Sequence, residues 1–163
     1  MPKTKNSVMS ARELKKTLER LTDEIMAKHQ DQGALVGIHC CGNTDWSLLL
    51  KTKADIINFD AWGFFDRVLL YRQALEDFLF RDGILAWGIV PTSEFTGKET
   101  VEGLRGKLEE QFHELSQKGI PEKTLRERCL LTPSCGMALM PEADAEKAMT
   151  LLSELSRRMI MDH

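Results

Sequence analysis

Four short apolar segments recur along this chain, and each is followed by a stretch with helical periodicity. The segments are residues 34–38 (ALVGI), 54–59 (ADIINF), 84–90 (ILAWGIV) and 129–132 (CLLT). Runs that are apolar at nearly every position are typical of strands buried on both faces, which occur in parallel sheets covered by helices. The pattern therefore predicts an α/β fold built on a four-stranded parallel sheet.

The segments between these runs predict the helices. Ser10 and Glu13 have the spacing of a capping box, so a first helix begins there and ends near Gly33. Four strand–helix units after one helix are half of an eight-stranded TIM (β/α)8 barrel. An open flavodoxin-like sheet is the alternative, although the sequence has no glycine-rich phosphate loop. The further helices are expected over residues 46–52, 66–80 and 99–118, as a turn over 125–128, and from Pro141 onward.

Length and composition limit the classes of protein that the chain can belong to. With 163 residues it has the size of one domain, and we expect residues 10–163 to form it after a flexible segment at 1–9. A formal net charge of −3 gives no electrostatic reason to expect nucleic acid or a membrane surface as partner. The apolar runs are too short to cross a bilayer, and the polar N-terminus lacks the apolar centre of a signal peptide. We therefore expect a cytoplasmic protein with reduced cysteines.

Three potential metal ligands follow the predicted strands. His39 and Cys41 come after the first strand, two residues apart, so an extended backbone points both side chains to the same side. Cys135 follows the fourth strand, and functional groups gather at the carboxyl ends of parallel strands. Imidazole and thiolates suit zinc, and three such ligands leave one tetrahedral position open. Core packing is the alternative for any cysteine, and it is what we expect for Cys40 and Cys129.

Other polar residues near the strand ends are weaker candidates. Asp60 ends the second strand and is a possible fourth zinc ligand. Asn43 is a candidate for substrate binding or for orienting a ligand, and Asp45 is expected to cap the following helix. Glu94 follows the third strand and could contact substrate, with a solvated loop as the alternative. Trp62 is a candidate for the wall of the pocket.

Four stretches of the chain resemble a known family. GIHCCGNTDW, ADIINFDAW, GILAWGIVPT and LLTPSCGM are similar to the last four strands of the catalytic barrel of the cobalamin-independent methionine synthase family. Corrinoid:thiol methyltransferases and the uroporphyrinogen decarboxylase-like superfamily share that barrel. The resemblance extends from about Ser10 onward, and its most specific motif is His39-x-Cys41 followed by Cys135 between Ser134 and Gly136. A glutamate zinc ligand of the methionine synthases corresponds to Asp60 here.

The resemblance implies zinc-dependent S-methyl transfer of the kind used in methionine biosynthesis. A homocysteine-like thiol would receive a methyl group from a methylfolate or a methylcorrinoid. Four strands alone leave two open sheet edges, so we expect a homodimer, pairing with an N-terminal half barrel, or a chain that is part of a longer protein. The alternative is a zinc-binding relative without methyl transfer, such as a thiol carrier or an assembly subunit. The third hypothesis is a decarboxylase-like relative, although decarboxylation does not require a His/Cys/Cys metal site.

Overall fold

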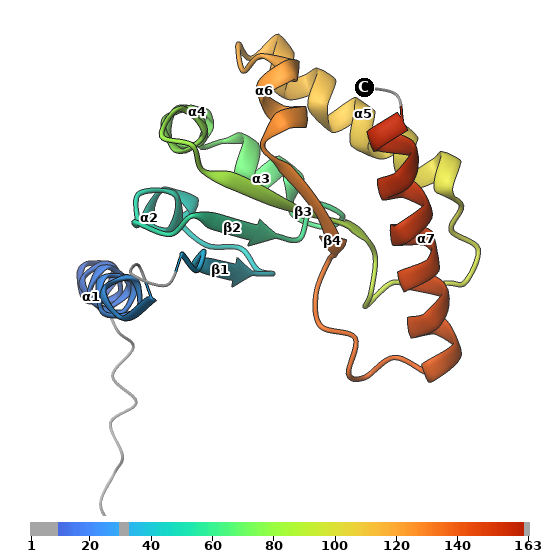
Figure 1. Ribbon diagram of the computed structural model, residues 1–163, viewed down its shortest axis with the longest axis horizontal. Helices are drawn as coiled ribbons and strands as arrows, with labels where there is room; N and C mark the ends of the chain where they lie inside the picture. Colours follow the sequence, from blue (N-terminus) through green and yellow to red (C-terminus); the bar gives the residue numbers. More distant parts are fainter. Residues whose placement is uncertain (1–9, 30–32, 162–163) are drawn as a thin grey trace, which may run out of the picture.

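The computed structural model describes residues 10–29 and 33–161, and four strands form its sheet. All neighbouring pairs are parallel and the spatial order follows the chain, as Figure 1 shows. The predicted α/β fold with a four-stranded parallel sheet is confirmed. The segment expected to be flexible, 1–9, lies outside the described residues. The strands are β1 (Gly37–Cys40), β2 (Ile56–Phe59), β3 (Ile84–Val90) and β4 (Cys129–Pro133).

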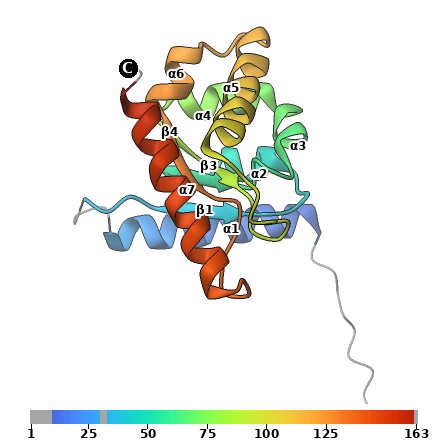
Figure 2. The same ribbon diagram turned by 90° about the vertical axis from the view of Figure 1, so that its right-hand side faces the viewer.

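Helices precede, connect and follow the strands. α1 lies alongside β1 at one edge of the sheet, and α7 packs along β4 at the other (Figure 1, Figure 2). No helix within the described part of the chain is long and apolar enough to cross a membrane. The helices are α1 (Ala11–His29), α2 (Trp46–Leu50), α3 (Phe65–Leu69), α4 (Arg72–Phe80), α5 (Val101–Gln117), α6 (Glu122–Glu127) and α7 (Glu142–Met161).

Several helix ends lie where the sequence predicted them. The backbone N–H of Ser10 donates to the Glu13 carboxylate at 2.8 Å, which completes the capping box of α1. Asp45 accepts a hydrogen bond of 3.0 Å from the backbone of Ser47 and is the N-cap of α2. Pro141 directly precedes α7, where its missing N–H costs no hydrogen bond. The caps of α2 and α7 fix where the chain leaves the loops after β1 and β4.

The first strand differs from its prediction. It was expected over residues 34–38, but β1 pairs with β2 only from Gly37 to Cys40, opposite Ile56 to Phe59. Because the neighbouring strand begins at Ile56, the pairing starts at Gly37; before it, the carbonyl of Val36 still accepts hydrogen bonds from the backbone of Asp55 and Ile56, and Leu35 is exposed. His39 therefore lies within β1 instead of following it.

The helix predicted over residues 66–80 is also different, because it is divided into α3 and α4. Tyr71 leaves the helical region, with φ −103° and ψ 34°, and Leu70 is exposed. Each short helix buries its own apolar side chains: Phe65 and Val68 on α3, and Leu75, Phe78 and Leu79 on α4. Burial of both short helices against the sheet thus overrides the continuous helical periodicity.

The main core lies between the sheet and the helices. Alternate side chains of the two central strands face it and are at most 1% exposed: Ile57, Phe59, Leu85, Trp87 and Ile89. The intervening side chains lie on the opposite, concave face of the sheet. That face carries more polar groups, including His39, Asn58 and Thr132.

Trp87 ties this core to the loop that follows β2. Its ring packs edge-on against Phe59 and Phe112, with centroids 4.9 and 5.1 Å apart. Its Nε1–H donates to Gln111 Oε1 at 2.6 Å, and Gln111 Nε2 donates to the carbonyl of Ala61 at 2.7 Å. The buried indole and amide therefore satisfy each other and fix the loop that begins with Asp60.

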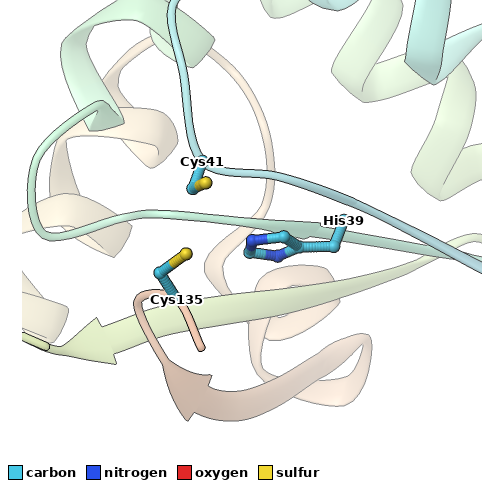
Figure 3. A group of neighbouring side chains, drawn as sticks. All are labelled: His39, Cys41 and Cys135. Atoms are coloured by element: carbon cyan, nitrogen blue, oxygen red, sulfur yellow. The ribbon is translucent and has the colours of Figure 1, made fainter. Parts of the chain in front are cut away.

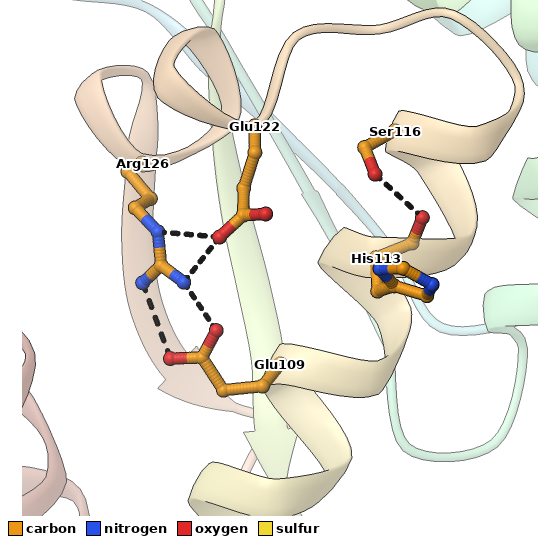
Figure 4. A network of polar contacts seen from close by, with 5 residues as sticks. All are labelled: Glu109, His113, Ser116, Glu122 and Arg126. Atoms are coloured by element: carbon orange, nitrogen blue, oxygen red, sulfur yellow. Dashed lines mark hydrogen bonds and ion pairs between the residues drawn. The ribbon is translucent and has the colours of Figure 1, made fainter.

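Ion pairs join α5 and α6 near the amino end of β4 (Figure 4). Arg126 of α6 binds the carboxylate of Glu109 on α5 in a bidentate manner, and its Nε donates to Glu122 at 2.9 Å. The pKa of Arg126 is raised, mainly by the hydrogen bond with Glu109. Within α5, Ser116 donates to the carbonyl of His113 at 2.8 Å. Because α6 leads directly into β4, these contacts hold the amino end of that strand.

Candidate metal centre

His39, Cys41 and Cys135 come together at the carboxyl ends of β1 and β4 (Figure 3). Their ligand atoms all lie within 4.8 Å of one another, and the described residues contain no other group of this kind. Zinc bonds of about 2.0 Å to nitrogen and about 2.3 Å to sulfur place tetrahedral ligand atoms roughly 3.5–3.8 Å apart. Small side-chain movements would close that difference, so the group could hold a metal ion.

The curl of the sheet makes this meeting possible. β1 and β4 are the two edge strands, separated by β2 and β3. In a flat sheet they would lie about 14 Å apart, since neighbouring strands are spaced about 4.8 Å apart. The sheet and the turn after β4 therefore curve enough to bring Cys135 back over the carboxyl end of β1.

Gly88 allows the strand ends to approach closely. Its carbonyl accepts hydrogen bonds of 3.0 Å from the backbone of both Ala61 and Trp62, at the shift in register between β3 and β4. A Cβ atom at this position would lie 2.5 Å from the carbonyl oxygen of Phe59 and 2.8 Å from the Cα of Ser134. Only glycine fits here, next to the segments that carry Asp60 and Cys135.

The two thiols differ in their affinity for a proton. The pKa of Cys135 is lowered, first by its interaction with the neighbouring Cys41 thiol and then by the nearby imidazole of His39. The pKa of Cys41 is raised, mainly by the same interaction with Cys135. The Cys135 thiol therefore ionises at a lower pH than the Cys41 thiol. Cys41 is exposed and Cys135 half-buried, so a cation can reach both.

His39 is held by a residue that sequence reasoning did not identify. Its Nδ1 lies 2.5 Å from Oδ1 of Asn58, which occupies the next strand directly opposite it. In Figure 3 the far edge of the imidazole, which carries Nε2, points toward the two sulfurs. The signal in the sequence was a single polar residue inside the otherwise apolar run 56–59.

Asp60 lies close to the group but outside it. Its carboxylate accepts a hydrogen bond of 2.8 Å from the backbone of Gly63, and it thereby caps the turn after β2. Its pKa is raised, chiefly by burial, with a smaller contribution from the nearby Glu94 carboxylate. As the side chain stands, Asp60 stabilises the turn through Oδ1, and its carboxylate is not part of the group of ligand atoms within 4.8 Å of one another.

Asp60 and Glu94 do share a cleft with the two cysteines. The cleft has a volume of ≈ 260 Å³, and Trp62 forms part of its wall. Trp62 Nε1 donates to Glu94 at 3.3 Å, while the ammonium of Lys107 lies 4.4 Å from the centre of its ring. The lining residues are Cys41, Asp60, Trp62, Gly63, Phe64, Pro91, Thr92, Ser93, Glu94, Ser134 and Cys135.

A larger cleft of ≈ 480 Å³ also borders Cys135. It shares Thr92, Ser93 and Cys135 with the first cleft, and its apolar walls are Phe95, Leu139 and Met140. Cys135 of the candidate metal centre therefore lines two clefts. Asn43, the other candidate for substrate binding, is exposed in the loop after β1 and lines neither cleft.

The remaining cysteines pack in the interior, as the sequence predicted. Cys40 and Cys129 are half-buried and lie against the hydrophobic core. Burial raises the pKa of Cys129 to about 12, so that its thiol keeps its proton at neutral pH. Among the four cysteines, only Cys41 and Cys135 belong to the metal group.

Comparisons with protein-family models, with curated proteins and with solved structures give no match to this chain. Fold and site together define the chain as an α/β protein with a His/Cys/Cys group that could hold a metal ion. Any more specific function has to be argued from the chemistry of that group.

Proposed function

We propose that the chain is a zinc-dependent protein that activates a thiol for methyl transfer, similar to the cobalamin-independent methionine synthases. The observation that carries the proposal is the group formed by His39, Cys41 and Cys135 beside a cleft. One imidazole and two thiolates favour zinc over magnesium or calcium, which prefer oxygen ligands. Three protein ligands leave a fourth position for substrate, as in catalytic zinc sites.

Different residues of the chain would hold the metal ion and bind the substrate in such a reaction. His39, Cys41 and Cys135 would hold the ion. A bound zinc ion supplies positive charge that favours the thiolate form of a substrate thiol. Asp60 and Glu94 place two carboxylates in the same cleft, which suits a thiol that also carries an ammonium group, as homocysteine does.

The methyl donor would approach from the second cleft. A methylfolate or methylcorrinoid presents its methyl group from a large, partly apolar ring system, and the larger cleft has apolar walls and opens beside Cys135. The reaction forms a bond between sulfur and the methyl carbon, breaks the bond from that carbon to the donor, and leaves the electron pair of that bond on the donor.

We also infer that the sheet is the C-terminal half of an eight-stranded α/β barrel. Its support is the consecutive parallel order and the curvature that brings the ligands of both edge strands together. Apolar side chains are exposed near both edges, among them Leu21 and Ile25 of α1 and Leu130 of β4. A second copy or an N-terminal half barrel would cover these edges. Light scattering distinguishes the two, because a native mass of one chain, 18.5 kDa, contradicts a homodimer.

Methyl transfer is tested with the zinc-loaded full chain, homocysteine, and either methylcobalamin or methyltetrahydrofolate. We expect methionine to form with one of the donors, and formation to stop when zinc is removed with a chelator and to resume when it is restored. Cys129→Ser, which changes a cysteine outside the metal group, should remain active. Stoichiometric zinc without methionine from either donor would contradict methyl transfer. That result would favour the second candidate, a zinc-binding thiol carrier or assembly subunit, for which the solvent exposure of His39 and Cys41 is the supporting observation.

A further inference from the structure

Asn58 connects three strands on the concave face of the sheet. Its Nδ2 donates to the carbonyl of Ala86 on β3 at 2.8 Å and to Oγ1 of Thr132 on β4 at 2.9 Å. Its Oδ1 lies 2.5 Å from Nδ1 of His39 on β1. One side chain therefore links the strand that carries His39 to the strand that leads to Cys135.

The hydrogen bonds determine which way the amide faces. The carbonyl of Ala86 can only accept, so the atom beside it must be the amide nitrogen of Asn58. The amide oxygen then faces His39 and can only accept, so Nδ1 of the imidazole must carry a proton. A neutral imidazole has one N–H, and its Nε2 is left with the free electron pair that a metal requires.

We propose that Asn58 is a positioning residue that selects the Nε2-ligating tautomer of His39 and aligns it with Cys135 through Thr132. This inference rests on the proposed metal centre and adds the residue that prepares it. A hydrogen bond from the second ring nitrogen commonly fixes the orientation of a ligating histidine. Here the acceptor is itself held at two further points, so the ring is oriented before an ion arrives.

The register of the sheet explains why these residues meet. Asn58 pairs with His39 on one side and with Ala86 on the other, so all three side chains stand in one row on the same face. Ala86 is only 3% exposed, and its methyl group is small enough for the amide to pass over β3 and reach Thr132. A larger side chain at position 86 would block that path.

The proposal is tested with four variants of the full chain. Asn58→Leu removes the acceptor and both donors at similar volume, whereas Asn58→Asp keeps an acceptor for His39. Thr132→Val removes only the hydroxyl that anchors Asn58. Thr150→Val is its matched control, since that hydroxyl donates only within α7, to the carbonyl of Glu146. Zinc affinity is measured by competition with a chromophoric chelator, and the tautomer of His39 by long-range ¹H–¹⁵N NMR on the metal-free protein.

We expect Asn58→Leu to weaken zinc binding by about 10- to 100-fold. Thr132→Val and Asn58→Asp should weaken it by smaller factors, because Asp keeps the acceptor for His39 but loses the hydrogen bond to Ala86. Thr150→Val should stay close to the unchanged chain. The NMR spectrum should show the Nδ1–H tautomer in the unchanged chain and its loss in Asn58→Leu. Unchanged zinc affinity in Asn58→Leu, or an Nε2–H tautomer in the unchanged chain, would overturn the proposal. Absence of zinc binding by the unchanged chain would instead refute the metal centre, and the NMR result would still decide whether Asn58 sets the tautomer.

Discussion

Cys135→Ser is expected to abolish stoichiometric zinc binding. Zinc sites with four protein ligands bind with about 10–16 kcal/mol in total, so one thiolate contributes about 3 kcal/mol, or roughly a hundredfold or more in affinity. Serine is nearly isosteric, but its hydroxyl does not ionise in the range where Cys135, with its lowered pKa, does. The number of zinc ions per chain after gel filtration, measured by elemental mass spectrometry, tests this expectation directly.

Cys40→Ser is the matched control for this variant. Cys40 is adjacent to Cys41 in the sequence but packs against the hydrophobic core, outside the metal group. The same chemical change at position 40 should therefore leave one zinc per chain. Full zinc content in Cys135→Ser, or equal loss in both variants, would show that the metal is not held by this group.

We expect Gly88→Ala to destabilise the fold more than the addition of a methyl group at any other position near the metal centre. The new Cβ would lie 2.5 Å from the carbonyl oxygen of Phe59 and 2.8 Å from the Cα of Ser134, both backbone atoms that cannot rotate away. Overpacking of this kind costs about 3 kcal/mol of unfolding free energy, which lowers the melting temperature by about 6–12 °C in a chain of this size. Urea unfolding followed by circular dichroism measures the change.

Gly106→Ala provides the comparison. Gly106 lies in α5, and a Cβ there would meet no atom within 4 Å. Alanine is the better helix former by about 1 kcal/mol, so this variant should be slightly more stable than the unchanged chain. If the Gly88→Ala variant were as stable as Gly106→Ala, this would show that β2, β3 and β4 do not approach one another closely at Gly88.

The strands and most helices could be predicted because their signals are local. Residues 84–90 are apolar at every position except one glycine, and β3 occupies that whole run. The start of β1 could not be predicted in this way, because it depends on where Ile56 begins the neighbouring strand. Similarly, the break between α3 and α4 could not be predicted, because the helical periodicity of residues 66–80 gives no sign of the departure at Tyr71.

The candidate site was predictable to the extent that it depends on strand ends. His39, Cys41 and Cys135 were expected to meet, and the structure brings them together. The hydrogen bonds that support His39 were not predictable, because they depend on contacts across the sheet. Asn58 reaches Thr132, which lies two strands away and 74 residues later in the chain. Nothing in either segment alone indicates that contact.

The most direct test of the metal centre is zinc K-edge X-ray absorption spectroscopy on the full chain loaded with one equivalent of zinc. Coordination by His39, Cys41 and Cys135 predicts two sulfur ligands at about 2.3 Å and one imidazole nitrogen at about 2.0 Å, with a light atom completing the shell. A shell of nitrogen and oxygen alone, or a chain that does not retain one equivalent of zinc, would contradict it.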